Sequence, residues 1–125
     1  MLVDVFQSTF DCEFKMTHEE IASIETHLDV VLPRPYKSVA LAGRFAEPIH
    51  NDATSIIAIN SAFRAGEFGD EGWRRNLVAI GHDGSGNYFC LDTDSFESGV
   101  YIRDHETLNV AREYDSFEAF VAEWG

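Results

Sequence analysis

The first apolar pattern of the chain repeats at helical spacing. It follows Thr17–Glu20, which has the form of a capping box, and it predicts a helix of about ten residues. The apolar stripe consists of Ile21, Ile24 and Leu28. Two prolines within Leu32–Tyr36 end this helix, because each disfavours the α conformation in the residue before it. Pro35 can occupy the first turn of a second short helix, and Gly43 is suited to be its left-handed C-cap.

The middle of the chain predicts β-structure. Apolar runs with the composition of strands occupy 55–59, 77–81, 88–92 and 99–103, and a polar segment punctuated by glycines lies between 60 and 76. The intervening residues 82–87 are rich in turn formers, which predicts a hairpin. Connections this short require the last three strands to pair antiparallel, because a parallel crossover needs a dozen or more residues.

The last pattern is again helical. Phe117, Phe120, Val121 and Trp124 fall at i, i+3, i+4 and i+7, with Asp115 or Ser116 as the N-cap. Together the patterns predict an α+β fold, in which N-terminal helices and a C-terminal helix pack on a central antiparallel meander. We expect one domain over residues 18–125. We expect residues 1–17 to be an N-terminal strand or arm, in which 2–14 are a strand or an irregular segment.

Composition and charge narrow the class of protein. The chain has 125 residues, 45% hydrophobic and 13% aromatic, which fits one globular domain. Its formal net charge is −13, from 22 acidic and 9 basic residues. This charge argues against nucleic acid and against an anionic membrane surface as partners. It favours fast association with a basic partner.

Cysteine usage and the first residues predict a cytoplasmic protein. Cys12 and Cys90 are the two cysteines, and their separation fits neither a zinc site nor a redox motif. We interpret them as free thiols in a reducing compartment. Residues 1–5 lack the basic and apolar regions of a signal peptide, and no apolar run approaches the roughly 20 residues of a membrane span.

No motif points to catalysis or to a cofactor. The loop Asp83–Asn87 lacks the glycine of a calcium loop at the required position, and it precedes a strand rather than the helix of a phosphate loop. Ser85 lacks the surroundings of a hydrolase nucleophile. A small metal-dependent enzyme that uses His82, Asp83 and His105 is the remaining catalytic hypothesis, and we rank it last.

Acidic residues near the strand ends are the candidate partner-binding residues. They form either a solvated rim or a focus of negative potential toward a cationic partner. The six candidates are Asp83, Asp92, Asp94, Glu97, Asp104 and Glu106. The basic groupings, Arg34 with Lys37 and Arg74 with Arg75, are expected to pair with nearby carboxylates.

Three segments resemble the SUKH superfamily, the Smi/Knr-type domain. Leu32–Ser38 is similar to the family's Leu-Pro-x-x-Tyr elbow between two helices. Ile80–Asp92 resembles its glycine-rich hairpin, which is followed by an aromatic residue and an aspartate. Gly99–Glu106 resembles its Val-Tyr…Asp-His-Glu strand, and Ser116–Phe120 resembles the start of its last helix. The resemblance extends over residues 18–122.

The resemblance implies an α+β domain without catalytic residues. Many bacterial members look like immunity proteins, which bind and neutralise a polymorphic toxin, often a nuclease. Other members are eukaryotic regulators of cell-wall synthesis and signalling that act as scaffolds. Some members look dimeric, so a homodimer remains open. We expect an immunity protein whose cognate toxin is basic, with the scaffold as the alternative.

Overall fold

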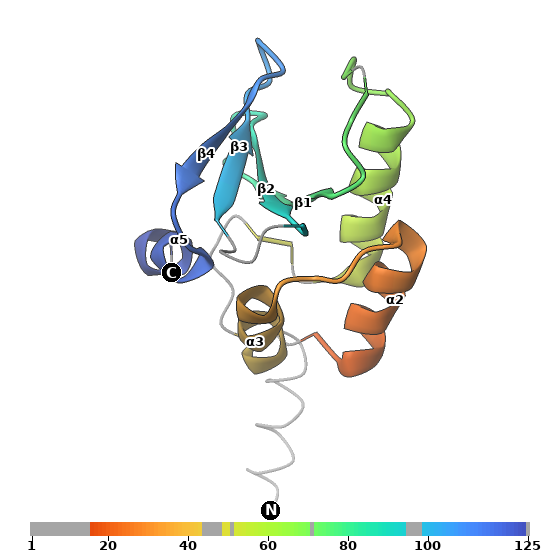
Figure 1. The fold of residues 1–125 in the computed structure, drawn as a ribbon, viewed down its shortest axis with the longest axis vertical. Helices are drawn as coiled ribbons and strands as arrows, with labels where there is room; N and C mark the ends of the chain where they lie inside the picture. Colours follow the sequence, from red (N-terminus) through yellow and green to blue (C-terminus); the bar gives the residue numbers. More distant parts are fainter. Residues whose placement is uncertain (1–15, 44–48, 51, 71, 95–98, 125) are drawn as a thin grey trace, which may run out of the picture.

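The computed structural model describes residues 16–43, 49–50, 52–70, 72–94 and 99–124 (Figure 1). Helices and a sheet succeed one another along the chain. The elements are α2 His18–Leu28, α3 Arg34–Ala42, α4 Ala53–Arg64, β1 Leu77–His82, β2 Tyr88–Asp92, β3 Val100–Arg103, β4 Val110–Tyr114 and α5 Phe117–Trp124. The N-terminal segment 2–14 lies outside the described residues.

The strands form an antiparallel meander in the order β1-β2-β3-β4. Tyr88 at the start of β2 pairs with both His82 of β1 and Arg103 of β3, so these three strand ends share one end of the sheet. The predicted α+β class, with helices packed on a central antiparallel meander, is confirmed (Figure 1).

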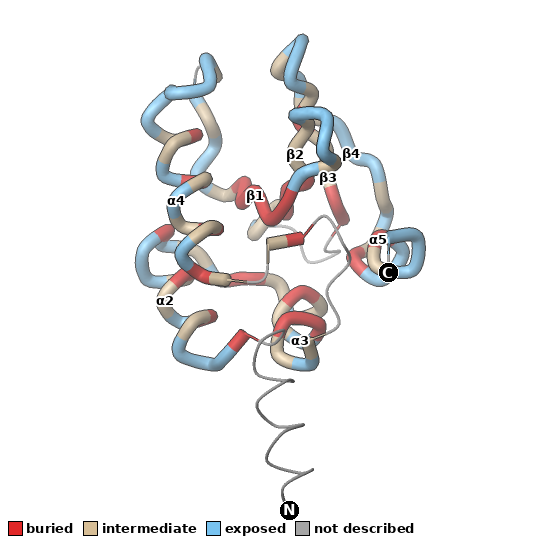
Figure 2. Tube along the Cα trace, turned by 180° about the vertical axis from the view of Figure 1, so that it is seen from behind, coloured by how far each residue is buried: buried red, intermediate tan, exposed pale blue. Residues whose placement is uncertain are grey.

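The main core fills one face of the sheet, which we call the inner face. Val78 and Ile80 of β1 and Phe89 and Leu91 of β2 point to it. On it α3 and α5 meet, where the Tyr36 and Phe117 rings lie 5.5 Å apart in an edge-to-face contact. Figure 2 shows buried residues along β1 and on α3, whereas β4 is exposed over most of its length. Apolar burial against the helices therefore fixes this face.

The first two helices confirm the expectations from the sequence. Thr17 and Glu20 form a reciprocal capping box, and the buried side of α2 is the predicted stripe Ile21, Ile24 and Leu28. Pro35 lies in the first turn of α3, and Gly43 ends this helix with φ 74° in the left-handed region. Met16, just before α2, is buried and donates its N–H to the carbonyl of Ala40.

The prediction of a strand at 55–59 is wrong, because these residues belong to the helix α4. The Asp52 side chain accepts from the Ser55 N–H at 2.8 Å and begins the helix. Its buried side includes Ile56, Phe63 and the polar Asn60, so the apolar run 56–59 is only part of a longer helical pattern. A short apolar run does not distinguish a strand from a buried helix.

Asn60 anchors α4 to β1, on the edge of this strand that faces away from β2. Its Nδ2 donates to the carbonyls of Ile56 and Ala79, both at 2.8 Å, and its Oδ1 accepts from the Ala79 N–H at 2.7 Å. The side chain is fully buried. An edge backbone group of the sheet is thereby paired by a side chain rather than by a strand.

The opposite face of the sheet, the outer face, carries a smaller core. Phe63, Ala79 and Cys90 are buried there, with Trp73 and Tyr88 half-buried around them. Trp73 stacks on Phe63 at 4.2 Å between ring centroids. The segment after α4 therefore folds back over this face.

The C-terminal part contains one strand that the sequence analysis missed. β4 pairs with β3, and its middle residues Ala111, Arg112 and Glu113 are exposed. The predicted helix follows as α5, where the Ser116 hydroxyl accepts from the Ala119 N–H, so Ser116 provides its N-terminal side-chain hydrogen bond. No helix within the described part of the chain is long and apolar enough to cross a membrane.

Candidate functional site

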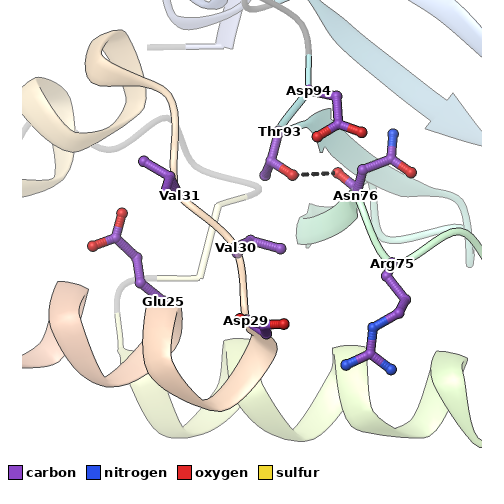
Figure 3. Close-up of a pocket in the computed structure, with 8 residues that line it drawn as sticks. All are labelled: Glu25, Asp29, Val30, Val31, Arg75, Asn76, Thr93 and Asp94. Atoms are coloured by element: carbon purple, nitrogen blue, oxygen red, sulfur yellow. Dashed lines mark hydrogen bonds between the residues drawn. The ribbon is translucent and has the colours of Figure 1, made fainter.

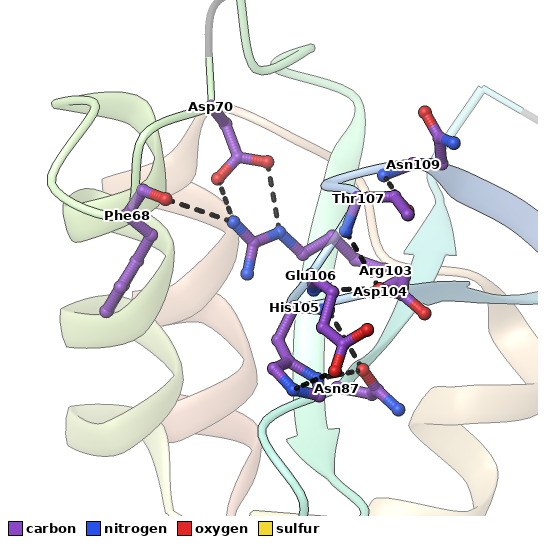
Figure 4. A network of polar contacts seen from close by, with 9 residues as sticks. All are labelled: Phe68, Asp70, Asn87, Arg103, Asp104, His105, Glu106, Thr107 and Asn109. Atoms are coloured by element: carbon purple, nitrogen blue, oxygen red, sulfur yellow. Dashed lines mark hydrogen bonds and ion pairs between the residues drawn. The ribbon is translucent and has the colours of Figure 1, made fainter.

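Three turns meet at one end of the sheet, and we call them the turn cluster: residues 65–70, 82–87 and 104–109. Figure 4 shows how side chains from all three converge. A Cβ placed on Gly69 would lie 3.7 Å from Leu108 Cδ1, which joins the first turn to the third. Hydrogen bonds between Asn87 and His105 join the second turn to the third. Segments distant in the sequence thus form one surface.

A buried ion pair holds the first turn against β3. Arg103 Nε donates to Asp70 Oδ2 at 3.0 Å, and its Nη2 donates to Asp70 Oδ1 and to the Phe68 carbonyl (Figure 4). The exposed fractions of the two side chains are 4% and 7%. The guanidinium also lies 4.9 Å from the centroid of the Phe63 ring. A bidentate ion pair that is shielded from water fixes the orientation of both side chains, and so of the first turn relative to β3.

Asn87 connects the other two turns. Its Nδ2 donates to Asp83 Oδ2 at 3.0 Å, while its Oδ1 accepts from the His105 N–H at 2.9 Å and lies 2.8 Å from His105 Nδ1. Gly86, at φ +99°, leaves room for the His105 ring, because a Cβ there would lie 3.2 Å from the ring. The two hairpin ends are therefore packed and hydrogen-bonded together.

Two aspartates of these turns, Asp83 and Asp104, are held as anions. The pKa of Asp104 is lowered by hydrogen bonds from the Thr107 and Glu106 N–H groups. Desolvation raises the pKa of Asp83, but hydrogen bonds from Ser85 and Asn87 outweigh it and lower the pKa below its usual value. Both aspartates stabilise their own turns and keep their charge at neutral pH.

The turn cluster carries negative charge without a compensating Lys or Arg of its own. The three turns contain five acidic residues and no Lys or Arg: Glu67, Asp70, Asp83, Asp104 and Glu106. Arg103 neutralises Asp70. Glu67 is exposed, and the Glu106 carboxylate is exposed beside His105, with 3.8 Å between Oε1 and Nε2. This end of the sheet therefore presents carboxylates to solvent.

A row of aromatic rings begins in the turn cluster. Phe68 is 42% exposed, and its centroid lies 6.5 Å from that of Tyr88. Tyr88 contacts His82 at 5.7 Å, and His82 contacts His50 at 5.6 Å, both edge to face. His82 is exposed, and Tyr88 and His50 are half-buried. We call these four residues the ring row.

A groove of about 580 Å³ lies at the other end of the sheet (Figure 3). The turn between α2 and α3 supplies one wall, with Asp29 and the 72% exposed Val31. The other wall includes Asp94 and Arg75. Because an arginine lines it beside the carboxylates, the groove has mixed charge, unlike the turn cluster.

The structure divides the six candidate acidic residues between these two places. Asp83, Asp104 and Glu106 belong to the turn cluster. Asp94 lines the groove, and Asp92 lies behind it, where its Oδ1 accepts from Asn76 Nδ2 and the Asp94 N–H. Glu97 lies outside the described residues. The six therefore do not form one patch.

Several residues of the turn cluster were not anticipated from the sequence. Phe68, Glu67 and Asp70 lie in the segment expected to be a polar excursion, and only the pairing of Asp70 with Arg103 across the fold reveals their position. The basic groupings behave partly as expected, because Lys37 Nζ lies 3.5 Å from Glu25 Oε2. The sequence feature that could have drawn attention to Phe68 is that it is an isolated aromatic residue in a segment between two glycines.

The residues of the metal-enzyme hypothesis have other roles in the structure. His82 Nδ1 accepts from the Gly84 N–H, Asp83 caps its turn, and His105 binds Asn87. Within the part of the chain that the structure describes, no group of three or more His, Cys, Asp or Glu side chains is placed to hold a metal ion. Cys90 is a buried free thiol, whose pKa burial raises to about 12.

Together these features define an α+β domain with helices on an antiparallel meander and an ordered, acidic end. A family model described as the SMI1 / KNR4 family (SUKH-1) matches residues 15–123. The chain therefore belongs to this family, and the resemblance seen in the sequence is confirmed. The comparison with curated proteins found no match.

Proposed function

We propose that this chain is a cytoplasmic, non-catalytic immunity protein that binds and neutralises a basic protein toxin. Membership of the SMI1 / KNR4 family supports a role in binding another protein. The net charge of −13 supports a partner of opposite charge. A nuclease is the toxin class that fits best, because its active site must attract phosphate and is therefore basic.

The observation that carries this proposal is the ordered turn cluster. Carboxylates that are held in place before binding lose less conformational entropy when a partner docks. The Arg103–Asp70 pair and the Asn87 hydrogen bonds provide this order. Inhibition then consists of occlusion, in which carboxylates occupy the surface where nucleic acid would bind.

Asp83, Asp104 and Glu106 lie at the centre of the proposed surface, and Glu67 extends it. Asp92, Asp94 and Glu97 remain candidates for a wider contact. Charged residues at the rim of an interface accelerate association more than they strengthen the final complex. A small number of buried contacts must then supply most of the affinity.

The test is a capture from native lysate at low and high salt, followed by an assay of the captured protein. We expect a basic toxin domain whose recovery falls as salt rises and whose activity the purified chain suppresses. Inhibition that does not compete with binding of the nucleic-acid substrate would contradict occlusion. Recovery of a partner whose activity the chain leaves unchanged would contradict the immunity role.

A scaffold in wall synthesis or signalling is the second candidate, because the same family match is compatible with it. The two candidates differ in what the capture recovers. A scaffold predicts a multi-protein assembly with no inhibited member. An immunity protein predicts one toxin and loss of its activity.

A further inference from the structure

We propose that the ring row Phe68, Tyr88, His82 and His50 is the docking site for an arginine-bearing segment of the basic partner. This inference rests on the proposed function and assigns its contact surface. The rings form a continuous series of contacts from the turn cluster toward α4, at 6.5, 5.7 and 5.6 Å between neighbouring centroids. Phe68 and His82 are exposed, so ring surface is available to a partner.

The charges around the row select a cation. Glu67 precedes Phe68, Asp83 follows His82, and Asp52 interacts electrostatically with His50. Arg103, the arginine of β3, is already neutralised by Asp70. Aromatic faces attract guanidinium groups, and neighbouring carboxylates strengthen that attraction. An aromatic surface with this charge pattern fits an arginine better than a neutral or acidic group.

The protein already contains the same combination in its interior. The Arg103 guanidinium lies 4.9 Å from the Phe63 centroid and binds the Asp70 carboxylate. Phe63 in turn contacts Phe68 at 4.9 Å and Tyr88 at 5.2 Å between centroids. The ring row thus continues, on the surface, an aromatic cluster that holds an arginine on its buried side.

The groove at the other end of the sheet provides the natural comparison. Val31 in this groove is 72% exposed, more than Phe68 at 42%. Among the described residues that line it none is aromatic, and Arg75 is one of them. If exposed apolar surface alone decided where the partner docks, the groove at Val31 would be the docking site. If recognition of arginine decides, the docking site is the ring row at Phe68.

The probe is a short peptide of alternating arginine and glycine, titrated into the full isotope-labelled chain and followed by amide chemical shifts. The matched peptide replaces arginine by citrulline, which keeps the shape of the side chain and removes its charge. We expect arginine-dependent shifts at the ring row, and affinity about two- to five-fold weaker in Phe68→Leu. The control Val31→Ala, at the groove, should bind as the parent does.

Three outcomes would overturn this inference. They are equal shifts from the citrulline peptide, shifts centred on the groove, and equal affinity of Phe68→Leu and the parent. Capture of a salt-sensitive toxin by Phe68→Leu at parental strength would overturn the docking site while leaving the proposed function intact. Absence of any inhibited partner would instead contradict the proposed function, whatever the peptide shows.

Discussion

Arg103 and Asp70, which are 33 positions apart in the sequence, form a bidentate ion pair. Two guanidinium nitrogens of Arg103 donate hydrogen bonds to the two carboxylate oxygens of Asp70. Arg103 ends β3, and Asp70 lies in the turn after α4, so this pair fixes the position of that turn on the sheet. The carbonyl of Phe68 accepts a third hydrogen bond from the same guanidinium. Phe68 and Glu67 therefore lie in a turn whose position relative to β3 is fixed by these hydrogen bonds.

Removing one partner of this pair should be costly. We expect Asp70→Ala to lower the free energy of unfolding by about 3–5 kcal/mol, because it leaves a buried guanidinium without its counter-charge. The double variant Asp70→Leu with Arg103→Met should recover much of that loss. Urea unfolding of Asp70→Ala, Asp70→Leu, Arg103→Met and the double variant measures these quantities. Additive losses in the double variant would show that the two side chains do not act as a pair.

The Asn60 side chain should be nearly as sensitive. In Asn60→Ala the buried N–H of Ala79 loses its acceptor, and we expect a loss of about 1–3 kcal/mol in the free energy of unfolding. The neighbouring exposed residue offers a control, since Ser61→Ala should change stability by less than about 0.5 kcal/mol. If the two substitutions have equal effects, Asn60 does not anchor α4 to β1.

Asn60 also explains why α4 was mistaken for a strand. The residues 55–59 are rich in isoleucine, which favours strands, and the buried asparagine interrupts the apolar stripe of the helix. Hydrogen bonds to a distant strand make this polar residue compatible with burial, and no local signal contains that information. The missed strand β4 has a related cause. It is an edge strand whose middle residues are exposed, so its apolar alternation is weak.

Local signals predicted the rest of the fold well. The capping box at Thr17, the prolines at the start of α3 and the turn formers at 82–87 act over a few residues, and each is found where expected. The candidate site was only partly predictable. Asp83, Asp104 and Glu106 were named from the sequence, but their meeting with Phe68 depends on the long-range pair between Asp70 and Arg103.

The Cys90 thiol should be inert in the folded protein. Its side chain is fully buried and burial raises its pKa to about 12, so almost no thiolate exists at neutral pH. In a Cys12→Ser background, iodoacetamide should modify Cys90 only as fast as the protein unfolds, as read by mass spectrometry with and without urea. Modification at the rate of a free peptide thiol would contradict the buried position.

Stability should fall as pH drops below the ordinary pKa of histidine. Burial lowers the pKa of His50, His82 lowers it further, and Asp52 opposes both. The unfolded chain therefore takes up a proton at a higher pH than the folded one, so unfolding is favoured as pH falls through about 6.5. The stability this histidine contributes is present above that pH and is lost below it.

His50→Gln isolates this effect. Between about pH 7 and pH 5 its free energy of unfolding should fall less steeply than that of the parent. Thermal or urea unfolding at several pH values measures the slope. Parallel slopes for the two proteins would show that His50 titrates equally in the folded and unfolded states.

The central claim is that the turn cluster, rather than net charge alone, attracts a basic partner. The most direct test measures the association rate constant of the captured toxin domain by stopped flow, across a range of salt. Two double variants remove the same charge from different places. Glu67→Gln with Glu106→Gln alters the turn cluster, and Glu113→Gln with Glu118→Gln alters exposed positions on β4 and α5.

At low salt we predict that the turn-cluster variant associates about two- to ten-fold more slowly than the parent, and that its rate depends less on salt. The control variant should stay close to the parent. Equal slowing in both variants would mean that the overall charge acts without a preferred surface. That result would contradict the account.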